Sequence, residues 1–205
     1  MQEIILNNSG STIRKFDGEN ENFHINPSEG TNIKFWAVIR NSKLSFKFDA
    51  EYENINIECY FLIPAIKNQN VELDIQTNFR SPNTKIIINV IALAGDQASI
   101  TLNWNLHILD WISKVEARLY EEALLTWDSK YISMIPWLRV DSPDVIASHW
   151  AKIQRISPER IFYMQSRWLD QDKAIWMIIN SYSQDIVEKM QLDEQQQTEF
   201  YSMIK

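Results

Sequence analysis

The chain has 205 residues, of which 45% are hydrophobic, and it carries a formal net charge of −7. This length and composition predict one large folded domain, or a domain with a tail, that can bury a real hydrophobic core. The acidic balance argues against a nucleic-acid groove, and the single Cys59 excludes a disulfide framework and a CxxC metal site.

The first part of the chain has the patterns of β-structure. The segment up to Glu21 is polar and offers two short candidate strands, at 3–6 and 12–16. From Phe23 onward, apolar and polar residues alternate, as they do in strands with one buried face. Such strands could form a sandwich, a barrel or a β-helix, and the near absence of hairpin turn dipeptides mildly favours a solenoid. The clearest alternating runs are 44–48, 55–63, 71–75, 86–90 and 100–108.

The last part of the chain has the patterns of helices. Ser157-Pro158-Glu159 is typical of a helix start, because Ser157 can cap free amides and Pro158 suits the first helical position. The sequence therefore predicts two parts, a β core over 1–156 and a C-terminal helical subdomain over 157–205. The expected helices are Pro158 to about Arg167, one capped by Asp170 that reaches about Met190, and one begun by the capping pair Asp193 and Gln196.

The two parts are joined by a stretch that begins at Ile135 and reads IPWLRVDSPDVIASHWAKIQRISPERIFYMQSRWL. It resembles the C-terminal core of the SufB/SufD proteins of iron–sulfur cluster assembly, whose pattern reads approximately IPxLxVxxxDVxASHGAxIGRIxxExLFYLxSRGI. The matched positions include Ile135-Pro136, Asp144-Val145, Ala147-Ser148-His149, Ile161-Phe162-Tyr163 and Ser166-Arg167. A weaker resemblance runs back to about Asn22, although full family members are longer than this chain.

The resemblance implies a mainly β fold, a right-handed parallel β-helix followed by a C-terminal α-helical tail. It also implies a subunit of the SUF cluster-assembly complex that pairs with a SufB-like scaffold and docks a SufC-like ABC-type ATPase. On this basis we expect no enzymatic activity and no stably bound cofactor. A transient iron–sulfur cluster would form at the partner interface.

Site residues follow from the same resemblance. SufB-type scaffolds carry a Cys and a Glu where this chain has Lys130 and Trp150, so the chain resembles the SufD branch and, without a thiolate there, should not build a cluster alone. His149 falls on the histidine that is implicated in cluster assembly in SufD-type proteins. A neutral imidazole binds iron readily, so His149 is a candidate cluster-assembly and metal-ligating residue, and its alternative is a hydrogen-bonded structural role.

Two partner surfaces are also implied. In the family, the C-terminal strands of SufB and SufD meet side by side, and the helical region docks the ATPase. The expected scaffold contacts are Leu124, Leu125, Val145 and Ser148. The expected ATPase contacts are Phe162, Tyr163, Ser166 and Arg167.

Other functions stay open from the residues alone. The alternative is a non-catalytic β-helical scaffold, or a homodimeric binding protein, without a role in cluster assembly. The chain has no Gly-rich phosphate loop, HExxH, GxSxG or dinucleotide fingerprint. It also has no run of 18 apolar residues and no signal-peptide pattern, so we expect no membrane association and a cytoplasmic location. His107 is expected to be structural, and the acidic pairs Glu121-Glu122 and Asp170/Asp172 are expected to be solvated faces.

The Gly and Trp contents are unusual. Four Gly is low against a typical share of about 7%, and eight Trp is high. Trp150 and Trp168 stand where the family pattern has Gly, and Trp104 and Trp127 also fall on family Gly positions. Trp168 follows an expected helix end, where a left-handed residue, usually Gly, closes the helix. Either some of these codons are UGA read as glycine in the source, or the Trp residues are real and fill core space.

Overall fold

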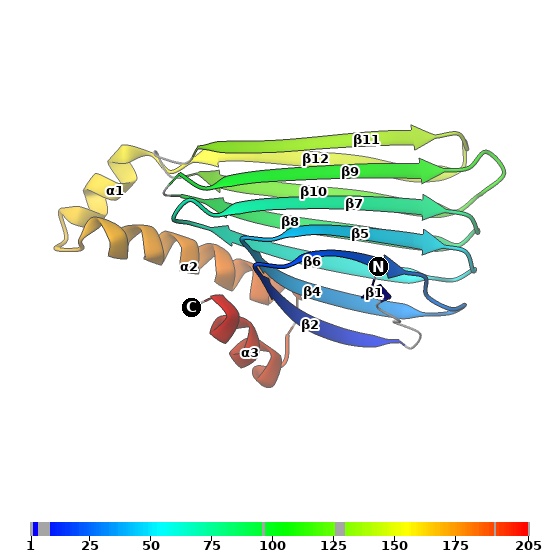
Figure 1. Cartoon of the computed structure of the whole chain (residues 1–205), viewed down its shortest axis with the longest axis horizontal. Helices are drawn as coiled ribbons and strands as arrows, with labels where there is room; N and C mark the ends of the chain where they lie inside the picture. Colours follow the sequence, from blue (N-terminus) through cyan, green and yellow to red (C-terminus); the bar gives the residue numbers. More distant parts are fainter. Residues whose placement is uncertain (1, 4–8, 96, 126–129, 191, 205) are drawn as a thin grey trace.

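The computed structural model describes residues 2–3, 9–95, 97–125, 130–190 and 192–204 (Figure 1). In this part of the chain, twelve strands come first and three helices follow. The strands are β1 Gln2–Glu3, β2 Gly10–Asp17, β3 Asn20–Ile25, β4 Asn32–Arg40, β5 Lys43–Ala50, β6 Asn56–Ala65, β7 Asn70–Phe79, β8 Thr84–Ala94, β9 Ser99–Ile108, β10 Val115–Leu125, β11 Tyr131–Val140 and β12 Val145–Arg155. The helices are α1 Pro158–Gln165, α2 Gln171–Met190 and α3 Glu194–Ile204.

The strands form two six-stranded sheets in which every described pair is parallel. Sheet A has the order β1-β3-β5-β7-β9-β11, and sheet B has the order β12-β10-β8-β6-β4-β2. Successive strands therefore alternate between the sheets, and each coil of the chain stacks on the one before it. Figure 1 shows the stack running from β2 to β11 and β12. The predicted parallel β-helix is confirmed, and a hairpin-based sandwich is excluded for the described strands.

The expected strands can now be placed. The candidate at 12–16 lies within β2. The candidate at 3–6 falls mostly on residues 4–8, outside the described residues. The later alternating runs all lie on strands, apart from Ile55, which comes directly before β6.

The alternation read from the sequence decides which side chains face the space between the sheets. Ile57 on β6 lies beside Ile86 on β8, which lies beside Ala117 on β10, and all three are buried. Phe46 on sheet A contacts Phe61 on sheet B, with ring centroids 5.2 Å apart. The two inner faces thus share one core, in which each large apolar side chain contributes about 1.5–3 kcal/mol.

The turns between strands explain how the chain coils with so few glycines. Asn41, Asn54 and Asn83 have positive φ values of 42°, 59° and 54°. Asn tolerates this left-handed conformation better than most residues with a side chain. The polar linker at 67–70 works in the same way, because Lys67 and Asn68 also have positive φ.

Each helix of the helical tail, α1 to α3, begins at the capping residue that the sequence predicted. The Ser157 hydroxyl accepts a hydrogen bond from the Arg160 amide at 3.3 Å, and the Asp170 carboxylate accepts one from the Lys173 amide at 2.8 Å. Asp193 and Gln196 bond to each other's amides at 2.8 and 3.1 Å, as in a capping box. These local contacts confirm the three predicted helix starts.

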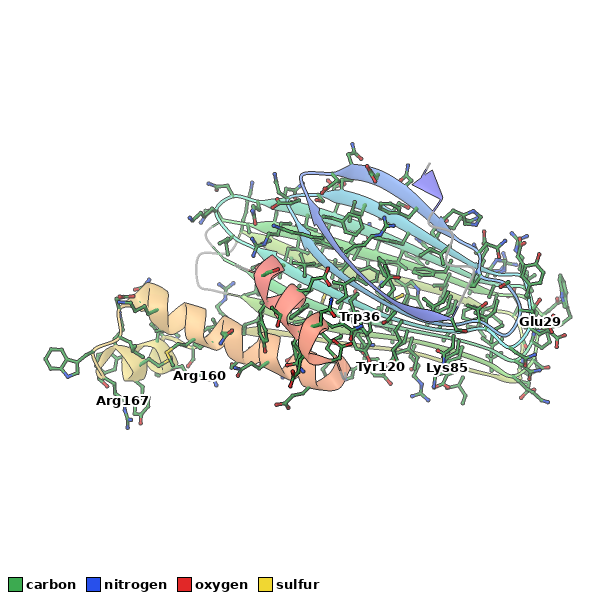
Figure 2. The ribbon with its side chains drawn as sticks, turned by 90° about the horizontal axis from the view of Figure 1, so that it is seen from below. Glu29, Trp36, Lys85, Tyr120, Arg160 and Arg167 are labelled. Carbon is green, nitrogen blue, oxygen red and sulfur yellow. The ribbon has the colours of Figure 1, made fainter. Side chains whose placement is uncertain are left out.

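The tail packs on the outer face of sheet B. Trp36, Leu62 and Leu124 on this face form a second core with residues of the tail, including Ile178 and Phe200. Figure 2 shows Trp36 near α3, and Arg160 and Arg167 at the end of the tail that projects beyond the sheets. The change from strand to helix falls at the predicted boundary, but the division into two domains stays a prediction because the tail shares this core with the sheet. None of the described helices combines the length and the apolar character needed to cross a bilayer.

The tryptophans in family Gly positions fall into different environments. Trp104 is fully buried in the β-helix, and its Nε1 donates a hydrogen bond to Thr77 Oγ1 at 3.0 Å. Trp168 has φ +68° and is 99% exposed, just beyond the end of α1. The left-handed backbone predicted at Trp168 is confirmed, whereas Trp104 fills core space as real divergence would require. Trp150 lies on β12 without a positive φ, and Trp127 lies outside the described residues.

One end of the β-helix is uncovered, and we call it the open end. It consists of β11 and β12, the last strands of sheets A and B, each paired on one side only. Among residues on the inner faces of these strands, Leu138, Val140 and Ile153 are exposed because no following coil covers them. Pro136 has no amide hydrogen to donate, and it is tolerated in β11 because an edge strand has no neighbouring strand on one side.

Candidate functional site at the open end of the β-helix

His149 lies on the inner face of β12, at the open end. It aligns with Leu119 on the neighbouring strand β10, and Leu119 faces the core. Its Nε2 atom lies 2.6 Å from the Glu121 Oε2 atom, also on β10. The His149 side chain is 20% exposed and that of Glu121 is 4% exposed. The carboxylate therefore lies deeper in the coil than the imidazole.

Glu121 is the residue of this candidate site that the sequence analysis did not predict. The expectation that Glu121-Glu122 forms a solvated face is wrong for Glu121, which is buried. The signal was present in the alternation, because Glu121 is in phase with the buried residues Val115, Ala117, Leu119 and Ala123. Burial raises the pKa of Glu121, and the hydrogen bond with His149 opposes this rise.

An imidazole and a carboxylate are ligands that iron accepts, but two groups do not complete its coordination. Within the residues that the structure describes, no group of three or more His, Cys, Asp or Glu side chains could hold a metal ion. An iron ion bound by His149 would therefore need further ligands from outside the described part of this chain.

Cys59 cannot supply such a ligand in the folded chain. It is fully buried on β6, and burial, followed by the charge of Glu58, raises the pKa of its thiol. Of the two positions that in SufB-type scaffolds carry Cys and Glu, Lys130 is exposed and Trp150 points to the outer face of sheet B, away from His149.

The other two histidines lie on the outer face of sheet A. His24 Nε2 lies 2.6 Å from Asp49 Oδ2, a partner that the sequence did not suggest. His107 Nε2 lies 3.5 Å from Asp141 Oδ2 without a hydrogen bond, and Asp141 accepts one from Arg139 at 2.9 Å. Both histidines therefore point away from the inner face, although His107 lies beside Arg139 on β11.

The four expected scaffold contacts occupy different places. Leu124 is buried beneath the helical tail, and Leu125 packs against the core between the sheets. Val145 and Ser148 lie on β12, with Val145 on its inner face and Ser148 on its outer face. Only Val145 and Ser148 therefore belong to the edge strand itself, and the scaffold contact stays a prediction.

The four expected ATPase contacts are brought together at the end of α1. Phe162 and Tyr163 are exposed. The Arg167 guanidinium lies 4.9 Å from the centre of the Tyr163 ring and also donates a hydrogen bond to the Tyr163 hydroxyl at 2.6 Å. Ser166 donates to the Tyr163 carbonyl at 2.7 Å. The structure makes these residues one exposed cluster, and their binding role stays a prediction.

Comparison with known proteins identifies the family. Residues 25–182 match the family model described as SUF system FeS cluster assembly, SufBD core domain. The iron–sulfur cluster assembly protein SufD of Escherichia coli is 26% identical over 98 residues, which is 48% of this chain and 23% of that protein. An iron–sulfur cluster assembly SufBD family protein of Archaeoglobus fulgidus is 37% identical over 76 residues, 37% of this chain and 21% of that protein. The matched stretches thus span less than a quarter of either relative's length. Because the family model covers most of the chain, this protein belongs to the SufBD core domain family of the SUF system of iron–sulfur cluster assembly.

Proposed function

We propose that the chain acts as a SufD-like subunit that pairs with a SufB-like scaffold at its open end and docks a SufC-like ATPase on its helical tail. The observation that carries this proposal is the uncovered last coil, whose inner face carries His149 together with the exposed apolar residues Leu138, Val140 and Ile153. The chain itself would have no enzymatic activity. It would keep no cofactor, and the iron–sulfur cluster would be the cargo formed at the partner interface.

The open end is suited to a protein partner for two physical reasons. Its edge strands present backbone N–H and C=O groups that another strand can pair with. Its inner face presents Leu138, Val140 and Ile153, whose apolar surface is more stable when covered. A scaffold seated here would cover both and would also exclude water from His149.

The chemistry of the site needs such a partner. A cluster requires several thiolate or imidazole ligands, and the buried Cys59 provides none. A SufB-like partner would bring the thiolates, while this chain would bring His149. The division of ligands between two chains would make assembly depend on pairing.

The end of α1 is suited to a second partner. Phe162 and Tyr163 expose aromatic surface next to the Arg167 charge. Aromatic residues and Arg are the types that most often dominate binding energy at protein interfaces. This cluster lies on the tail, at the end that projects beyond the sheets (Figure 2), and not on β11 or β12, so both partners could bind at once.

The test is a binding series with a SufB-like scaffold and a SufC-like ATPase. Val145→Asp should abolish scaffold binding and leave ATPase binding intact, because a buried unpaired charge costs several kcal/mol, about 3–5. Arg167→Ala should do the reverse, and Glu29→Ala, an exposed change between β3 and β4 and away from both the open end and the tail, serves as the control (Figure 2). His149→Ala should keep both partners bound but reduce cluster formation.

The outcomes separate the alternatives. Failure of the chain to bind either partner, together with a homodimer that Val145→Asp disrupts, would support the homodimeric binding protein instead. Normal cluster formation with His149→Ala would make His149 structural.

A further inference from the structure

The His149 imidazole has two nitrogen atoms, and the structure engages one of them. Nε2 faces the Glu121 Oε2 atom at 2.6 Å, a distance typical of a strong hydrogen bond to a carboxylate. Because the Glu121 side chain is the more buried of the two, the carboxylate holds the ring from the protein side. The nitrogen that Glu121 leaves free is Nδ1.

This arrangement has a chemical consequence. A neutral imidazole carries one N–H group and one lone pair, on different nitrogens. If Nε2 donates its hydrogen to the carboxylate, the lone pair lies on Nδ1. Metal-ligating histidines commonly donate their other N–H to a carboxylate, which fixes both the tautomer and the orientation of the ring.

We propose that Glu121 is a positioning residue for cluster assembly, which accepts the Nε2 hydrogen of His149 and thereby presents Nδ1 as the atom that binds iron. This inference rests on the proposed function of His149. It adds the identity of the ligating nitrogen and a role for a residue on a different strand.

The surroundings of Glu121 support a role beyond packing. Its register neighbours on successive strands, Val90 on β8 and Phe61 on β6, are both apolar and buried. Among the described residues, His149 is the only side chain that bonds to the Glu121 carboxylate. A carboxylate in an apolar row with one partner is a poor choice for stability alone. A role in holding the His149 ring explains why a carboxylate occupies this apolar row.

The first test measures iron binding in the complex of this chain with its SufB-like scaffold, using Fe²⁺ without oxygen and a competing chelator. Glu121→Leu should weaken Fe²⁺ binding by about 10–100-fold, as loss of such carboxylate partners does elsewhere. Glu121→Gln keeps an acceptor oxygen and should stay within a few-fold of the unchanged chain. Scaffold pairing, followed by size-exclusion chromatography, should be the same for both variants.

The second test reads the tautomer directly in the chain alone, by nitrogen NMR of ¹⁵N-labelled histidine at pH 8. The chain has three histidines, so replacing each in turn assigns the signals. His149 should show a protonated Nε2 and an unprotonated Nδ1, and its Nε2 proton should disappear or shift in Glu121→Leu. The His24 signal should stay unchanged in that variant, and Asp49→Asn should alter His24 while leaving Fe²⁺ binding unchanged.

The outcomes distinguish this inference from the proposed function. If His149→Ala abolishes Fe²⁺ binding but Glu121→Leu binds normally, the role of Glu121 is overturned and that of His149 stands. A proton on Nδ1 of His149 in the unchanged chain would also overturn it, even if Glu121→Leu failed to fold. If His149→Ala itself binds Fe²⁺ normally, the proposed function of His149 fails first.

Discussion

A histidine next to a buried carboxylate occurs both at the open end and in the covered coils, by which we mean the coils with a neighbouring coil on each side. His24 and Asp49 in the covered coils, and His149 and Glu121 next to the open end, each place Nε2 2.6 Å from a carboxylate oxygen. The carboxylate side chains are 3% and 4% exposed. Geometry alone would therefore give both pairs the same role.

The difference lies in the other partners of each carboxylate. Asp49 also accepts hydrogen bonds from Lys47 Nζ at 2.6 Å and Asn78 Nδ2 at 2.7 Å. Burial alone would raise the pKa of Asp49, but these donors and His24 outweigh it and lower the pKa. For Glu121, burial dominates and the pKa is raised. Several donors to one buried carboxylate are typical of a pair that stabilises the fold, whereas a buried carboxylate with a single partner and a raised pKa is typical of a functional site.

The largest expected effect compares a tryptophan in the covered coils with one on the tail. Trp104→Gly should destabilise the chain by about 3–5 kcal/mol, because it leaves a cavity and an unpaired Thr77 hydroxyl. Trp168→Gly should stabilise it by about 1 kcal/mol by relieving the left-handed backbone. Urea denaturation of both variants measures the two changes. Loss of stability in Trp168→Gly would show that the strain argument is wrong there, and UGG at codon 168 would end the codon hypothesis for that position.

The next effect sharpens the comparison between the two carboxylates. Asp49→Ala should destabilise the chain by about 2–3 kcal/mol, because the Lys47 and Asn78 donors lose their shared acceptor. Glu121→Leu should leave stability unchanged or raise it by about 1 kcal/mol, because an apolar side chain suits that row. Thermal and urea unfolding at pH 7 compare them. Equal losses in the two variants would remove the distinction between the pairs.

The smallest effect is the dependence on pH, with opposite signs for the two groups. The lowered pKa of Asp49 means that its contribution is present above the unfolded pKa, about 3.9, and is lost as pH falls through the folded value. The raised pKa of Glu121 means the reverse: its contribution is present below the unfolded pKa, about 4.3, and is lost as pH rises through the folded value.

Two conservative variants test these signs. Glu121→Gln should therefore gain stability over the unchanged chain at pH 7, by no more than about 1 kcal/mol, and the gain should shrink at pH 4. Asp49→Asn should lose stability at pH 7, and its deficit should shrink below pH 4. Unfolding free energies between pH 3 and pH 8 follow both variants. A gain for Glu121→Gln that grows in acid would contradict the assigned direction.

The sequence by itself determined the local elements of this protein. Period-two alternation placed the strands β5 to β9, and Ser157, Asp170 and Asp193 placed the helix starts. These features depend on neighbours a few residues apart, so residue order is enough to predict them. The choice of a β-helix over a sandwich came mainly from family resemblance, because alternation is the same in both folds.

Only the tertiary structure decided which residues that are distant in sequence contact one another. Glu121 and His149 are 28 residues apart, and they touch because one coil stacks on the next with Leu119 beside His149. Likewise, Leu124 and Leu125 are adjacent in sequence, yet Leu124 lies beneath the helical tail and Leu125 lies between the sheets. Stacking register and the placement of the tail depend on the sum of many distant contacts, which no local pattern records. The same stacking stops at β11 and β12, and for that reason no further coil covers the His149 side chain.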